Sequence, residues 1–126
     1  MNNFSLTEKK KLLSLAKRLN AAHGRRQVLA NKANNILNKS QISLREFAYP
    51  TTNASRNVVR EYQRLEQLIQ YANGHIRNVA RKIIANYPTI ANMSHKNIIR
   101  NATESIRRHE KALRNIHSGR YQTQRR

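Results

Sequence analysis

The 126-residue sequence contains no cysteine, no aspartate and no tryptophan, and it has only three glycines and two prolines. Without cysteine there can be no disulfide bond, no thiolate nucleophile and no cysteine-ligated metal. No apolar run approaches the roughly 20 residues that cross a bilayer, and no signal-peptide core follows Met1. We therefore expect a protein that is neither secreted nor membrane-spanning.

Acidic residues are also scarce. Six glutamates face 25 lysines and arginines, so the formal net charge is +19 and the pI is about 11.6. Such an excess of one sign opposes compaction unless a polyanion binds, and nucleic acid is the commonest polyanion, followed by an anionic membrane surface. The hydrophobic share of 38% is below the roughly 45–50% of typical globular chains. We expect a thin core that depends on a partner for full stability.

The sequence does not indicate a catalytic site. Its glutamates mostly have arginine neighbours at helical spacing, which favours surface ion pairs, and no metalloprotease, nucleophile-elbow or glycine-rich phosphate motif is present. His109 lies on an apolar helix seam, and His117 is about 12 Å further along, too far to share one metal. We expect His109 to be a packed, hydrogen-bonded core residue. The prediction is a protein without enzymatic activity, cofactor, metal or small-molecule substrate.

Helical signals fill the first forty residues. Ser5 and Glu8 have the spacing of a capping box, so a helix should begin near Leu6. Its cations lie mostly away from its apolar stripe, which consists of Leu12, Leu15, Ala16 and Leu19. Gly24 is a natural stop. A second helix, over residues 25–39, would pack through Leu29, Ala33, Ile36 and Leu37.

The sequence predicts that residues 41–53 form a connector between helices. Within it, 41–48 should form a short helical turn that carries Phe47 inward. Pro50 forces the preceding residue out of helical geometry, and Thr52 and Asn53 have side chains that can cap the following helix.

The second half of the chain predicts two long helices. Apolar residues recur at three–four spacing along 54–86, and this phase passes through Gly74 unbroken, which favours one helix despite a glycine cost of about 1 kcal/mol. The same spacing predicts a helix over 95–117, followed by a basic tail, 118–126. Strand-like alternation and long-period repeats are absent. We predict a single basic all-α domain, 1–126, built as a bundle of about four helices, two of them long.

Arginine and lysine line the polar faces of these helices. Guanidinium groups bind phosphate oxygens bidentately and keep their charge, which suits contact with a phosphate backbone. Surface charge normally mixes both signs, and these faces do not. The predicted phosphate-contact residues are Lys9, Lys10, Lys17, Arg18, Arg25, Arg26, Arg56, Arg60, Arg64, Arg77, Arg81, Arg100, Arg107, Arg108, Lys111, Arg114, Arg120, Arg125 and Arg126.

Positive charge on every helix favours sequence-tolerant contact with many phosphates, with DNA favoured over RNA. In length, lack of cysteine, basic composition and helical content, the chain resembles the coat proteins of archaeal filamentous viruses, which sheathe DNA. The resemblance implies a virion or nucleoprotein particle inside cells, built from many copies of the chain or of related subunits. The alternatives are a bacterial-type or organellar ribosomal protein, a membrane-surface protein based on the first helix, and a helix-turn-helix around "AAHGRRQ".

Overall fold

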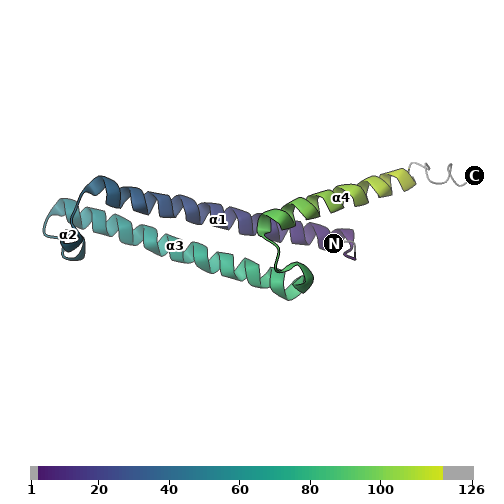
Figure 1. Ribbon diagram of the computed structural model, residues 1–126, viewed down its shortest axis with the longest axis horizontal. Coiled ribbons are helices and arrows are strands. Elements are labelled where there is room, and N and C mark those ends of the chain that lie inside the picture. The colour runs from purple at the N-terminus through teal and green to yellow at the C-terminus, as the bar shows by residue number, and fades with distance from the viewer. Residues whose placement is uncertain (1–2, 118–126) are drawn as a thin grey trace, which may run out of the picture. The chain divides into compact units, whose positions relative to one another are not determined.

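The computed structural model describes residues 3–117, and within that range it is helical with no β-strand (Figure 1). The elements are α1 (Leu6–Ser40), α2 (Leu44–Ala48), α3 (Asn53–Asn86), a 3₁₀ turn η1 (Pro88–Ile90) and α4 (His95–His117). The predicted all-α class is therefore confirmed. Three helices are long, whereas the sequence predicted two, and the basic tail lies outside the described residues.

The additional long helix arises because Gly24 does not end a helix. The predicted helices, one stopping at Gly24 and the next covering 25–39, are one continuous α1. Gly24 is exposed, and a Cβ built there would meet nothing within 4 Å. A glycine inside a helix costs only about 1 kcal/mol relative to alanine, so a lone glycine need not break a helix that packs on both sides of it.

The seam of α1 also keeps its phase across this glycine. Three–four spacing leads from Ala22 through Arg26 to Leu29, and the arginine occupies a position where an apolar residue would be expected. Its guanidinium is half-buried, and its Nε donates a hydrogen bond to the Asn73 side-chain oxygen at 2.6 Å. Because this position carries a charge, the apolar pattern of the sequence does not reveal that the seam continues past Gly24.

The connector is held by a network of side-chain caps. α1 ends at Ser40, and Gln41 follows with a φ of 53°, the left-handed conformation common after a helix. The helical turn predicted over 41–48 is present only as the short α2, Leu44–Ala48. The half-buried ring of Phe47 in α2 meets the Tyr62 ring edge-on, with centroids 5.2 Å apart.

Thr52 caps α3, as the sequence predicted. The Ser55 N–H donates to the Thr52 hydroxyl at 3.1 Å, and the Thr52 N–H donates to the Ser55 hydroxyl at 3.1 Å. This reciprocal pair satisfies two backbone donors at the helix start. α3 then runs through Gly74 without a break, which confirms the prediction from its apolar phase, and it ends at Asn86, before Pro88.

The chain divides into two compact units. The first, the terminal unit, contains Met1–Asn20 and Val79–Arg126; the second, the hairpin unit, contains Ala21–Asn78. In the terminal unit the start of α1, the end of α3, η1 and α4 surround a core of large apolar side chains. Its buried members are Leu12, Ala16, Leu19, Val79, Ile83, Tyr87, Ile90, Ile98, Ala102 and Ile106.

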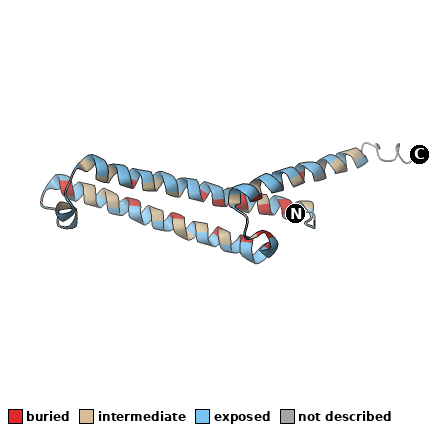
Figure 2. Ribbon diagram, viewed as in Figure 1, coloured by how far each residue is buried: buried red, intermediate tan, exposed pale blue. Residues whose placement is uncertain are grey.

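The hairpin unit consists of the remainder of α1 and α3, side by side, with α2 at the connection (Figure 1). Buried positions are sparse along it in Figure 2. Its fully or nearly buried residues are Ala22, Ala33, Ser55, Leu65 and Ala72. Alanine allows the two helices to approach closely but buries little apolar area, so this unit has the thin core that the composition predicted.

Candidate functional site

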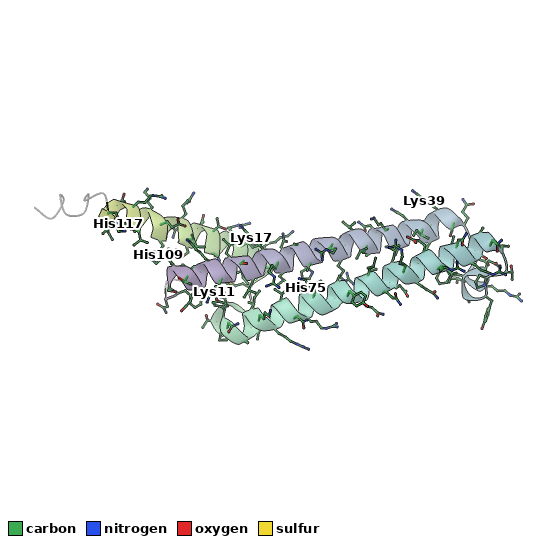
Figure 3. The ribbon with its side chains drawn as sticks, turned by 180° about the vertical axis from the view of Figure 1, so that it is seen from behind. Lys11, Lys17, Lys39, His75, His109 and His117 are labelled. Carbon is green, nitrogen blue, oxygen red and sulfur yellow. The ribbon has the colours of Figure 1, made fainter. Side chains whose placement is uncertain are left out.

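Most of the predicted phosphate-contact residues lie on the surface. The exposed ones are Lys10, Lys17, Arg18, Arg25, Arg56, Arg60, Arg64, Arg77, Arg81, Arg100, Arg107, Arg108, Lys111 and Arg114. Figure 3 shows Lys17 extending from α1. Arg26 is half-buried against α3, and Lys9 is only 6% exposed. Arg120, Arg125 and Arg126 lie outside the described residues.

The densest arrangement is on α4. Because successive helical residues are about 100° apart, five exposed cations of α4 fall within an arc of about 60°. We call this set the α4 cationic line: Lys96, Arg100, Arg107, Lys111 and Arg114. None of the five side chains makes an ion pair or hydrogen bond with another described residue. The apolar side of the same helix is held in the core by Ile98, Ala102 and Ile106, which fixes the line toward solvent.

Sequence reasoning found four members of this line and missed Lys96. Helical periodicity could have identified Lys96. It lies four residues before Arg100 and eleven before Arg107, and these spacings place all three on the same side of the helix. At 1.5 Å per residue, the line extends about 27 Å from Lys96 to Arg114. That length corresponds to roughly eight base-pair steps of a duplex at 3.4 Å each.

The arginines of α3 are used differently. Arg64 forms a two-pronged contact with Glu61, from Nε at 3.1 Å and from a terminal nitrogen at 2.6 Å. This hydrogen bond lowers the pKa of the Glu61 carboxyl and raises the pKa of Arg64. Arg56 donates to the Asn53 side-chain oxygen at 3.0 Å and to the Thr51 carbonyl at 3.4 Å, so its guanidinium is held at the start of α3.

The other three predicted arginines of α3, Arg60, Arg77 and Arg81, are exposed and make no ion pair or hydrogen bond with another described residue. They belong to different compact units, because Arg60 and Arg77 lie in the hairpin unit and Arg81 lies in the terminal unit. These three arginines therefore add separate positive charges to the two units, and they do not form a line like the one on α4.

Glu46 is engaged within the chain. One oxygen of its carboxylate accepts from the Thr51 N–H at 2.6 Å, the Ser55 hydroxyl at 2.7 Å and the Thr51 hydroxyl at 2.8 Å. These donors, the Thr51 backbone foremost, hold the pKa of Glu46 at about 2, below its ordinary 4.5. The role of this carboxylate is to lock the turn between α2 and α3.

A pocket of about 460 Å³ opens between the start of α1 and α4, within the terminal unit. Its walls combine Lys9 with the α4 residues Asn101, Glu104, Ser105, Arg108, His109 and Ala112. His109 was expected to be a hydrogen-bonded core residue. The structure corrects this, because His109 is half-buried at the pocket wall and makes no hydrogen bond to another described residue. Figure 3 shows it on the part of α4 beside the first turns of α1.

Within residues 3–117 there is no cluster of three histidine or glutamate side chains that could hold a metal ion. None of the described helices is long and apolar enough to span a membrane. No protein-family model matches the chain, and no curated protein and no solved structure is significantly similar to it.

Proposed function

We propose that this protein is a structural, sequence-tolerant nucleic-acid-binding protein that coats or packages a genome by contacting its phosphate backbone. The observation that carries the proposal is the α4 cationic line. Five like charges held on one side of a rigid helix repel one another, and no described carboxylate pairs with them. Phosphates along one face of a nucleic acid would neutralise the line without requiring any particular base.

Sequence tolerance is supported by the kind of surface the chain offers. Lysines and arginines are exposed on α1, α3 and α4, so contacts would be spread over many phosphates. The strongly exposed aromatic residues of the described chain, Tyr49 and Tyr71, are both in the hairpin unit, and neither lies on α4. This favours backbone contact over base stacking.

Assembly of several copies is supported by the hairpin unit. Its core is thin, while Val28, Leu68 and Tyr71 remain exposed at 53%, 36% and 78%. A groove of about 390 Å³ in this unit has a wall that includes the apolar residues Leu29, Leu68 and Ala72. Contact between neighbouring copies on a polymer would bury such surface and add the apolar burial that one copy lacks.

The first test is the salt dependence of binding to duplex DNA. If six to ten phosphates are contacted, affinity should fall about 10³–10⁵-fold between 50 and 200 mM salt. Fluorescence anisotropy with several unrelated duplex sequences should give similar affinities. A response that is flat in salt, or confined to one sequence, would overturn the proposal.

A charge-matched pair of variants tests the α4 line itself. The line variant carries Arg100→Gln, Arg107→Gln and Arg114→Gln, and the control carries Lys32→Gln, Lys39→Gln and Arg45→Gln, exposed residues of the hairpin unit. Both variants lose three charges. The line variant should reduce the salt slope by about two to three and should bind at least tenfold more weakly than the control. Equal losses would show that only net charge matters.

Copy number separates coating from a ribosomal role. Sedimentation and electron microscopy of the protein on long duplex DNA should reveal many regularly spaced copies. One copy bound to a folded RNA, with duplex DNA ignored, would support the ribosomal alternative instead.

A further inference from the structure

Lys9 has an unusual environment for a lysine. The sequence predicts a solvent-facing cation at this position, yet the residue is only 6% exposed. It occupies the same three–four seam as Leu12 and Ala16, which are completely buried. No side-chain nitrogen or oxygen of the described residues is both buried and without a hydrogen-bond partner, so the buried part of Lys9 is its stem, and its ammonium group reaches solvent at the pocket. Lys9 makes no ion pair or side-chain hydrogen bond with another described residue.

The surroundings of Lys9 supply donors instead of a counter-charge. The pocket wall on α4 presents the amide of Asn101, the hydroxyl of Ser105 and the imidazole of His109. Arg108 lies at the same pocket and adds a second cation. One carboxylate, Glu104, is also present, but it faces Arg108 at 3.7 Å and that pair is largely in solvent. The pocket therefore keeps an uncompensated positive charge.

We infer that this α1–α4 pocket seats one phosphate group, with the Lys9 ammonium as its charge partner and Ser105, Arg108 and His109 as flanking donors. A phosphate oxygen accepts hydrogen bonds from all of these groups, and charge-assisted bonds of this kind are the strongest available to it. The inference rests on the proposed function, because it assigns one particular phosphate of the bound nucleic acid to one particular site.

The first experiment needs no variant. Inorganic phosphate is titrated into the full chain, and the imidazole ¹H–¹³C NMR signals are followed at constant pH and ionic strength. The His109 signal should shift in a saturable manner. The signals of His75, in the hairpin unit, and His117, at the end of α4, should move much less, since neither lines this pocket. Equal shifts at all three, or the same response to chloride, would overturn the inference.

The matched variants are Lys9→Met and Lys10→Met. Both remove one charge from adjacent positions of α1, but Lys10 is exposed and does not line the pocket. Methionine keeps an apolar stem at the buried position, which preserves packing. Lys9→Met should abolish the phosphate-dependent shift of His109 and weaken oligonucleotide binding about tenfold, whereas Lys10→Met should keep the shift and weaken binding about twofold. Indistinguishable variants would mean that the Lys9 stem is buried for packing alone.

If Lys9→Met fails to fold by circular dichroism, Ser105→Ala and Arg108→Gln provide the test from the α4 wall, and both should diminish the His109 shift. Oligonucleotides with and without a 5′-phosphate then distinguish the source of the group. Equal affinities identify a backbone diester, and a preference for the phosphorylated end identifies a terminal monoester. Failure of the proposed function would look different: no oligonucleotide would bind the unmodified chain, whatever inorganic phosphate does at His109.

Discussion

The terminal unit and the hairpin unit are both basic and helical, but they are stabilised in different ways. The terminal unit buries large side chains from three helices, such as Leu12, Val79 and Ile98, at 1% exposure or less. The hairpin unit buries mainly alanines and a single large aliphatic residue, Leu65 at 2%. Stability in the first should come from apolar burial, whereas the second relies more on helix propensity and on the capped turn around Glu46.

This difference bears on the proposed function. The α4 cationic line and the Lys9 pocket both belong to the terminal unit, where a dense core can hold charged side chains in fixed positions. The hairpin unit has the thin core and five of the eight exposed large apolar residues of the described chain, which suits contact between copies. We therefore propose that the terminal unit binds the nucleic acid and that the hairpin unit makes the contacts between copies.

The largest expected effect is in the dense core. Ile98→Ala removes a side chain that is 1% exposed, and we expect a loss of about 3–5 kcal/mol because the tightly packed surroundings cannot collapse around the cavity. Urea unfolding followed by circular dichroism measures the change. The control, Ile84→Ala, alters a residue that is 55% exposed and should cost about 0.5 kcal/mol or less. Similar costs would mean that the terminal unit lacks a tightly packed core.

Leu65→Ala should have a smaller effect, about 2–3 kcal/mol, because the alanine-rich seam around it can close more easily. The location of the effect is the sharper test. Amide hydrogen exchange should accelerate along 53–78 and change much less along 95–106, in the other unit. Equal acceleration in both segments would show that the two units unfold as one cooperative body.

Acid should loosen the hairpin unit through Glu46. The folded pKa, about 2, is below the ordinary 4.5, so the stabilisation is fully present above pH 4.5 and is lost progressively as the pH falls toward 2. Glu46→Gln should therefore remove part of the fall in thermal midpoint between pH 5 and pH 2. Glu110→Gln, which changes a glutamate of the terminal unit, should leave this fall intact. The hypothesis fails if the two variants have the same acid profile.

The smallest expected effect is an increase in the free energy of unfolding. Gly24→Ala should stabilise the chain by about 0.5–1 kcal/mol, because α1 is helical there and a Cβ would meet nothing within 4 Å. Gly74→Ala should give a similar gain, since its Cβ would meet only the flexible end of Arg77 at 4.0 Å. Chemical denaturation measures both variants. A loss of stability at Gly24 would indicate that α1 is interrupted at that residue.

Local sequence signals predict several of the helices correctly. The continuity of α3 follows from apolar spacing that keeps its phase through Gly74, and the same spacing predicts α4. In the structure, the Ser94 hydroxyl accepts from the Asn97 N–H at 3.2 Å at the start of α4. The same phase rule does not reveal the continuity of α1 through Gly24. It fails there because Arg26 stands on the seam, and hydrophobicity alone cannot recognise an arginine that is held by Asn73.

What the sequence determined by itself is the helical class, most helix ends and the strong positive charge, because each of these depends on local spacing, capping residues and composition. Only the tertiary structure decided which charges are free. Lys9 and Arg100 are both cations on amphipathic helices, but one packs against α4 and the other faces solvent. The physical reason is that the burial of a side chain depends on which helix packs against its side of its own helix. The packing of one helix against another is a property of the whole folded chain and cannot be read from a local segment.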